Sequence, residues 1–414
     1  GMEKLVPSGV NYMNLEWQMK TPQTEKSKSN QDMYTGIQYQ YSADKEVDYL
    51  SFTSTDEEKI KSKLTWVAFK QQFFSSIFIA KNGFEKPTLL ASTKSETSIY
   101  IKELYAKLEL PYTHKNNEQL NFQFYFGPND YKILKAYNTG FEELIPLGWG
   151  IFGWINQYII INIFDFLSKY MSNYGLIILL LTIIIKLALS PFTYKAYLSQ
   201  AKMKVLKPEI DKITEKHKKK DPMKAQQETM ALYRKAGVNP MGGCLPMLVQ
   251  FPILIAMFRF FPASIELRQK SFLWADDLSS YDSILDLPWD IPFYGDHVSL
   301  FTLLMTISTI MYTKMNSQSM GGQMEQMKWI MYLMPVMFLG FFNNYAAALS
   351  YYYFLANIFT FSQQYFMKRF IDEDAILAQL EANKKKPAKP KSKFQKKLEE
   401  MQRKQEQQMK NRKK

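Results

Sequence analysis

Long apolar stretches fill the second half of the chain, whereas the first third alternates polar and apolar positions. Five stretches come close to the roughly 20 residues that a helix needs to cross a bilayer. They are 174–194, 243–262, 297–315, 327–344 and 346–367. The last two are separated by only a few residues around Asn343, so we expect a tight antiparallel hairpin there. The pattern predicts a polytopic α-helical membrane protein with five core transmembrane helices.

Residues 34–140 follow a different pattern, with polar residues alternating with apolar or aromatic ones over short runs. Gly, Pro and Asn separate the runs, and Asn82-Gly83 is typical of a turn. This spacing suits an antiparallel β-sandwich, which we assign to a domain of residues 1–140. A solvent-facing domain without a site of its own is the simplest reading of it. The runs are 36–41, 47–53, 64–69, 73–79, 99–104 and 120–126.

The segment 141–171 mixes Trp and Tyr with Asn, Gln, Asp and Lys. It has the length to span a bilayer. Its polar residues and its Trp content favour an amphipathic helix that lies in the membrane interface.

Charge is distributed unevenly, and this predicts the orientation. The net charge is +13, with basic residues concentrated in 195–235 and 384–414 and acidic ones in the loop 264–296. By the positive-inside rule the basic segments lie in the cytoplasm and the acidic loop outside. Because the number of spans is odd and the tail is cytoplasmic, the β domain lies outside the cytoplasm. We assign the membrane core to residues 172–370.

Residues 196–240 between the first two spans predict a charged cytoplasmic helical hairpin. Met203, Leu206 and Ile210 recur at helical spacing in its first helix. Its second helix, at about 222–236, includes Met230 and Tyr233, and we expect it to begin at Pro222 and to stop at Gly237. The hairpin is either a solvated spacer or an arm that contacts clients or the membrane through these residues.

The tail 371–414 ends in a strongly basic stretch, 384–414, with almost no aromatic residues. Such a segment is expected to be disordered or a fraying helix. It could bind anionic lipids beside the membrane or the phosphates of ribosomal RNA.

Lys186 lies near the middle of the first predicted span. A charged side chain at that depth costs about 3 kcal/mol of insertion free energy, so such residues are rare and usually have a function. Thr182, Lys186 and Ser190 follow at i, i+4 and i+8, which places them on one helix face. No Asp or Glu lies at a matching depth in any predicted span. We therefore expect this face to line a hydrated groove within the bilayer.

Other predicted spans carry polar stripes as well. One runs through 297–315 and includes Thr306; another runs through 346–367 and includes Tyr353 and Asn357; Gln250 lies in the second span. Polar residues in membranes often only hold helices together. The polar stripes therefore either line a groove or pack the helices against one another.

The remaining chemistry is sparse. Cys244 is the only cysteine and the three histidines are scattered, so no disulfide, metal site or cofactor is expected. We find no phosphate-binding loop and no paired intramembrane carboxylates. A Ser–Lys hydrolase built on Ser190 and Lys186 is conceivable, but no oxyanion donors accompany it. We therefore do not expect an enzyme.

Several motifs resemble the bacterial YidC family of membrane protein insertases. They include Val238-Asn239-Pro240-Met241-Gly242-Gly243-Cys244-Leu245-Pro246, Gln250-Phe251-Pro252-Ile253, Tyr332-Leu333-Met334-Pro335-Val336 and Tyr352-Tyr353-Phe354-Leu355-Ala356-Asn357. Lys202 to Ile210 and Phe126-Gly127-Pro128 are similar to the family too. The likeness covers about 126–370, and residues 1–125 match only in character.

The resemblance implies a function without nucleotide hydrolysis: insertion of nascent membrane proteins into the bacterial inner membrane, alone or beside the Sec translocon. A basic residue in a groove would attract the hydrophilic part of a client. That position falls on Lys186, where the family usually has Arg. Lys supplies the positive charge, but unlike Arg it cannot bind a carboxylate through two parallel hydrogen bonds. Members also carry an N-terminal anchor. The chain opens Gly-Met without such a segment, so we expect it to begin inside the β domain.

We expect Lys186, Thr182, Ser190, Gln250, Thr306, Tyr353 and Asn357 to line the groove, with the basic tail near the ribosome. A channel or solute transporter that uses the same wet cavity is the alternative. It predicts inverted repeats, and the sequence shows none.

Overall fold

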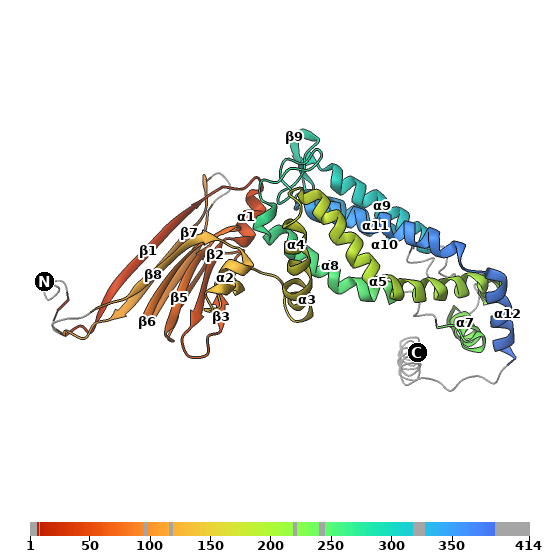
Figure 1. Cartoon of the computed structure of the whole chain (residues 1–414), viewed down its shortest axis with the longest axis horizontal. Coiled ribbons are helices and arrows are strands. Elements are labelled where there is room, and N and C mark those ends of the chain that lie inside the picture. The colour runs from red at the N-terminus through yellow and green to blue at the C-terminus, as the bar shows by residue number, and fades with distance from the viewer. Residues whose placement is uncertain are drawn as a thin grey trace, which may run out of the picture. The chain divides into compact units, whose positions relative to one another are not determined.

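A computed structural model describes residues 6–7, 9–94, 98–115, 119–217, 222–239, 245–317 and 328–385 of the chain (Figure 1). The chain folds as two compact units. The first comprises Gly1–Leu187, Gln250–Ile310 and Leu333–Phe359, and the second Ala188–Val249, Met311–Tyr332 and Thr360–Lys414.

The N-terminal part of the first unit is an antiparallel sheet with strand order β1-β7-β6-β5-β2-β3, in which β4 and β8 also pair with β6. Its strands are β1 (Tyr12–Pro22), β2 (Gly36–Tyr41), β3 (Val47–Tyr49), β4 (Asp56–Lys59), β5 (Leu64–Lys70), β6 (Phe74–Thr93), β7 (Tyr100–Pro111) and β8 (Phe122–Pro128). The antiparallel arrangement follows the sequence prediction. The alternating residues of β1 were not recognised as a strand.

The predicted turn at Asn82-Gly83 is absent, because these two residues lie inside strand β6. The strand runs from Phe74 to Thr93 without interruption, and it changes partners near Phe84. Its first half pairs with β5 and β8, and its second half with β7 and β4. Gly83 has φ +70°, so the backbone bends there without reversing. The turn prediction is wrong because Asn-Gly here supplies a bend inside one long strand.

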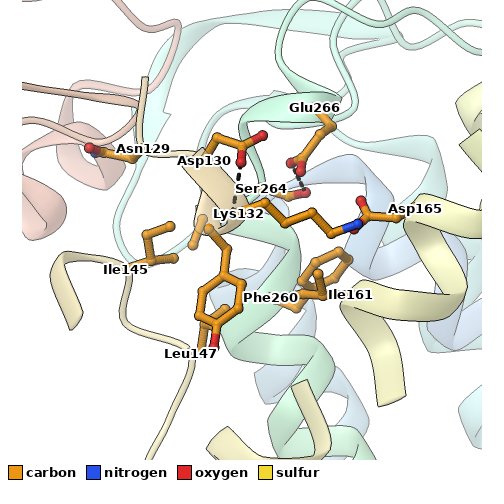
Figure 2. Close-up of a pocket in the computed structure, with 12 residues that line it drawn as sticks. Asn129, Asp130, Lys132, Ile145, Leu147, Ile161, Asp165, Phe260, Ser264 and Glu266 are labelled. Carbon is orange, nitrogen blue, oxygen red and sulfur yellow. Dashed lines mark hydrogen bonds and ion pairs between the residues drawn. The ribbon is translucent and has the colours of Figure 1, made fainter. Parts of the chain in front are cut away.

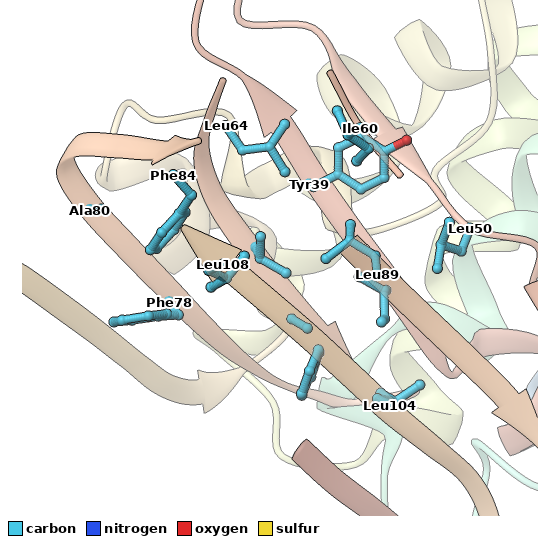
Figure 3. Packing of buried hydrophobic residues seen from close by; sticks show 14 of the residues in the cluster. Tyr39, Leu50, Ile60, Leu64, Phe78, Ala80, Phe84, Leu89, Leu104 and Leu108 are labelled. Carbon is cyan, nitrogen blue, oxygen red and sulfur yellow. The ribbon is translucent and has the colours of Figure 1, made fainter. Parts of the chain in front are cut away.

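One hydrophobic core lies between the two halves of the sheet (Figure 3). Val67 and Phe78 enter it from the first half, and Leu89 and Leu104 enter it from the second. Trp17 on β1 stacks on the ring of Phe69 at 3.8 Å between centroids. The predicted sandwich therefore takes the form of two half-sheets that share β6.

Two lysines are buried beneath the short helix α1 (Lys28–Tyr34). Lys102 donates to the carbonyl oxygens of Asp32 at 2.8 Å and Thr35 at 2.7 Å, and Lys70 donates to that of Tyr34 at 2.8 Å. Carbonyls at the end of a helix lack intrahelical partners, and cations satisfy them. The two ammonium groups therefore hold α1 on the sheet.

The stability of the β domain is expected to depend on pH through Lys70. Burial lowers the pKa of this ammonium to about 7, whereas an unfolded lysine has a pKa of about 10.4. Between these values only the unfolded state binds the proton. The free energy of unfolding therefore rises with pH across this window, by at most about 1.4 kcal/mol per pH unit.

Lys70→Met is expected to remove this slope. The measurement is urea-dependent hydrogen exchange of β5 amides in the intact chain at several pH values. Lys81→Met, at an exposed position, is the matched control and should keep the slope. A slope equal to that of the unsubstituted protein in Lys70→Met would show that Lys70 stays charged when folded.

Helices and one β-hairpin make up the rest of the first unit. The helices are α2 (Tyr131–Ala136), η2 (Phe141–Leu144), α3 (Ile151–Ile155), the π-helical turn η3 (Asn156–Ile160), α4 (Ile161–Ser168), the first part of α5 (Tyr174–Val205), most of α8 (Leu245–Ala263), η5 (Ile265–Leu267), most of α9 (Leu300–Ser317), most of α10 (Lys328–Asn343) and the first part of α11 (Ala347–Arg369). The hairpin β9 (Leu285–Ile291) and β10 (Gly295–Val298) precedes α9. Asn156 is fully buried and donates to the carbonyls of Leu147 at 2.7 Å and Ala256 at 2.9 Å. These bonds fasten the segment 141–171 to α8.

Two helices in the described part of the chain are long and apolar enough to cross a membrane by length and composition, Ile151–Ser168 and Tyr174–Val205. Three shorter apolar helices lie at Leu248–Ala263, Leu300–Met315 and Trp329–Asn343. The structure thus places helices at all five predicted spans, while the number that cross a membrane stays a prediction.

Helix α5 (Tyr174–Val205) continues beyond the predicted end of the first span at Tyr194. Pro191 lies inside this helix without ending it, as is tolerated where neighbouring groups satisfy the freed carbonyl. The chain turns at Leu206, and α6 (Lys207–His217) follows with Pro208 in its first turn.

The second unit contains the end of α5, α6, α7 (Pro222–Ala236), α12 (Glu373–Lys384) and the remaining parts of α8, α9, α10 and α11. Gly237 follows α7 with φ +70°, and the Val238 amide donates to the Tyr233 carbonyl at 2.9 Å. This geometry ends the helix at the predicted glycine. Residues 386–414, most of the predicted basic tail, lie outside the described residues.

Candidate functional site

Lys186 is 6% exposed on α5, and its ammonium donates to the Gln250 side-chain oxygen on α8 at 3.2 Å. The structure therefore brings together two polar residues from different predicted spans. Gln250 is a neutral acceptor, so this hydrogen bond orients the Lys186 ammonium and does not neutralise it. A positive group held this way can attract an acidic segment.

Thr182 is fully buried one turn before Lys186. Its hydroxyl donates to the carbonyl of Ile178 on the same helix at 2.7 Å. The hydroxyl is thus satisfied within α5, a common arrangement for Thr in membrane helices. Thr182 shares the helix face predicted from the sequence, and its donor is engaged locally.

Tyr353 and Asn357 on α11 fasten neighbouring helices. The Tyr353 hydroxyl donates to the carbonyl of Leu254 on α8 at 3.1 Å. The Asn357 amide donates to the hydroxyls of Ser308 at 2.9 Å and Thr309 at 3.0 Å, both on α9. The contacts of these two residues thus fit helix packing, one of the two roles that the sequence left open.

Thr306 differs from its neighbours on α9. It is 6% exposed, and its hydroxyl has no hydrogen-bond partner within the described residues. It therefore does not join helices as Thr309 does. Its role as a polar lining of the groove stays a prediction.

Ser190 belongs to the second unit, where its hydroxyl accepts a hydrogen bond from the Gln363 side chain at 2.9 Å. Gln363 lies in the last part of α11. The contact joins α5 to α11 within that unit. The geometry thus provides a packing role for Ser190.

The apolar face of the helical hairpin predicted at 196–240 is covered by α12. Met203, Leu206, Ile210 and Tyr233 are buried in one cluster, and Met230 packs against it; the other buried members are Ala236, Val238, Ile376 and Leu380. Residues predicted to meet clients thus form a local core. Contact through them would require α12 to move.

Helix α12 itself was not predicted, since residues 371–414 were assigned to a basic tail. Asp372 caps its N-terminus by accepting from the amides of Asp374 and Ala375. Ion pairs at its two ends join Glu373 to Lys204 at 2.7 Å and Lys384 to Glu209. The signal in the sequence was Ile376 and Leu380 at i, i+4 behind a capping Asp.

A polar cluster between β10, α9 and the α10–α11 connection was also missed. Asp282 is 1% exposed and accepts from the Trp274 indole at 2.8 Å and the Phe301 amide at 3.0 Å. Asn343 is fully buried and bonds Ser299, Tyr294 and His297. The sequence had indicated only an acidic loop, because nothing in it shows which Asp is buried.

A small cleft lies between α2, α4 and the end of α8 (Figure 2). Lys132 extends toward Asp165 and forms an ion pair with it, and the Ser264 hydroxyl donates to Glu266 at 2.7 Å. Burial raises the pKa of the Glu266 carboxyl. None of the predicted groove residues lines this cleft.

Comparison with known proteins covers almost the whole chain. Residues 6–161 match the model of the YidC periplasmic domain, and residues 166–374 match that of the 60Kd inner membrane protein. Relatives named "Membrane protein insertase YidC" from Parabacteroides distasonis, Bacteroides fragilis and Porphyromonas gingivalis are each 46% identical. The alignments cover 97%, 98% and 98% of this chain and 66%, 68% and 67% of the relatives.

The fold and these matches define an integral inner-membrane protein with a periplasmic β-rich domain. The chain belongs to the YidC family of membrane protein insertases. The resemblance read from the sequence motifs is thus confirmed, and the matches give no support to a channel or transporter. The chain spans about two thirds of the length of the relatives it matches.

Proposed function

We propose that this chain moves nascent membrane proteins into the bilayer by holding their polar segments at a hydrated groove centred on Lys186. The observation that carries the proposal is the hydrogen bond between Lys186 and Gln250, which fixes a cationic group amid apolar helices. A polar client segment held there has a shorter apolar barrier left to cross. No nucleotide hydrolysis is needed, since burial of the client's apolar helix in lipid drives the transfer.

The groove has three principal residues in this proposal: Lys186, Gln250 and Thr306. Lys186 supplies charge and Gln250 orients it, whereas the Thr306 hydroxyl offers a donor that no described residue uses. Tyr353, Asn357 and Ser190 join neighbouring helices through the contacts described above, whereas the Thr182 hydroxyl bonds within α5. This division is finer than the sequence prediction, which assigned all seven to the groove.

The proposed topology has five spans, at α5, α8, α9, α10 and α11, with the helical segment 151–168 lying in the outer interface. Exposed aromatic residues in this segment and just before it support an interfacial position: Trp149, Trp154 and Tyr158 are 64%, 54% and 57% exposed. The basic α5–α8 connection and the basic tail then lie in the cytoplasm. There the tail would contact the ribosome and anionic lipids, and the Sec translocon would be an optional partner.

The proposal is tested by reconstituting the purified chain in proteoliposomes without nucleotide. A single-span client with an acidic translocated tail is expected to become protected from external protease far more efficiently than in protein-free liposomes. The same vesicles should not release a trapped small dye. Dye release without protection of the client would instead support a channel.

A further inference from the structure

The hairpin β9–β10 exposes a set of large apolar side chains, which form its apolar face. In β9 these are Leu285, Trp289 and Ile291, and the exposed Asp286 and Asp290 lie between them in the sequence. Leu285 is 58% exposed and Trp289 66%, and Phe293 in the turn is 98% exposed. Large apolar groups gathered on such a surface mark a site of interaction.

The turn of this hairpin is fixed against α10. The side-chain amides of Asn343 and Asn344 donate to the Tyr294 carbonyl at 3.0 and 2.9 Å. A Cβ atom at Gly340 would lie 2.7 Å from the Phe293 carbonyl oxygen, so only glycine lets the two backbones approach this closely. Phe293 therefore stands beside the last turn of α10.

We propose that the β9–β10 hairpin is a lipid anchor whose apolar face inserts into the outer leaflet at its interface. The inference rests on the proposed topology, in which α10 spans the bilayer. Beside Gly340, α10 exposes Met337, Phe338 and Phe341, at 66%, 46% and 51%. The apolar surface of the hairpin continues this lipid-facing surface at the depth where Trp and other aromatic residues are enriched.

Charge indicates which lipid headgroups the anchor fits. Asp286 and Asp290 in β9 are exposed, as is Asp296 before His297. Carboxylates at a membrane surface are repelled by anionic lipids within a Debye length. The hairpin is therefore suited to a zwitterionic surface, and its bonds to Asn343 and Asn344 would hold the α10–α11 connection at that level.

The test uses the full chain with Cys244→Ser and one new cysteine carrying an environment-sensitive fluorophore. Phe293→Cys is informative because the side chain is almost fully exposed and its loss leaves the core intact. In phosphatidylcholine vesicles, lipids with quenchers near the headgroup should quench this label strongly, and quenchers deep in the acyl chains less. Asp290→Cys, at an exposed acidic position of the same strand, is the matched control and should stay unquenched.

A label at Met337→Cys separates this inference from the proposed topology. If lipid quenchers reduce the fluorescence of the label at 337 but leave the labels at 293 and 290 equally unquenched, the lipid anchor is wrong and the proposed topology stands. If position 337 is also unquenched, α10 does not meet lipid and both fail. A blue-shifted label at 293 that lipid quenchers do not reach would mean that a protein covers the hairpin, which also overturns the lipid anchor.

Discussion

Replacing Lys186 with Glu is expected to slow insertion of a client with an acidic translocated tail by at least about tenfold, which corresponds to about 1.4 kcal/mol of lost attraction. Lys186→Ala should have a smaller effect in the same direction. Lys186→Arg should retain activity, because the charge at this depth is the working feature. The measurement is protease protection of the client in proteoliposomes containing equal amounts of folded protein.

Thr182→Val is the matched control on the same face of α5. The Thr182 hydroxyl is satisfied by Ile178, so this variant should insert clients at the unsubstituted rate. A client with a neutral tail should also be much less sensitive to Lys186→Glu than the acidic one. Normal insertion by Lys186→Ala and Lys186→Glu would remove Lys186 from the mechanism, and the apolar surface of the core would then have to carry it.

Leu380→Ala is expected to destabilise the packing of α12 on the α6–α7 hairpin by about 2–5 kcal/mol, the usual range for a buried leucine. Leu380 is 1% exposed in the cluster with Leu206 and Ile210. Loss of its side chain leaves a cavity where α12 meets α6 and α7. The amides of α6 and α7 should lose protection in hydrogen exchange, while those of the β domain stay unchanged.

The same helix provides the control for this prediction. Leu377 is 39% exposed, so Leu377→Ala removes a similar side chain with little loss of burial and should cost well under about 1 kcal/mol. Equal protection of α6 in the two variants would mean that α12 does not support the hairpin in solution.

The sequence located most elements, because hydrophobic period and length carry that information locally. The stretch around Lys186 predicted a helix with a polar face, and α7 begins at Pro222 and ends before Gly237 as expected. Local sequence signals gave a wrong prediction where pairing with a strand distant in sequence decided the backbone conformation. Asn82-Gly83 is typical of a turn, but β7 and β4 continue the ladder on β6.

The candidate site shows the same division. That Lys186 is buried in an apolar helix follows from its neighbours in sequence, and so does the membership of Thr182 and Ser190 in its face. Which polar residues pair does not follow, because hydrogen bonds such as Lys186–Gln250 and Asn357–Ser308 join helices that are distant in sequence. Sequence reasoning therefore grouped seven residues that the contacts separate into different roles.

By itself, the sequence determined the family and the positions of the apolar helices, since motifs and hydrophobic period are local properties. The orientation predicted from the charge pattern stays a prediction. Only the tertiary structure decided which polar residues join helices, that α12 covers the hairpin, and that β9–β10 displays an apolar face. These depend on burial, and burial is set by packing between segments far apart in the chain.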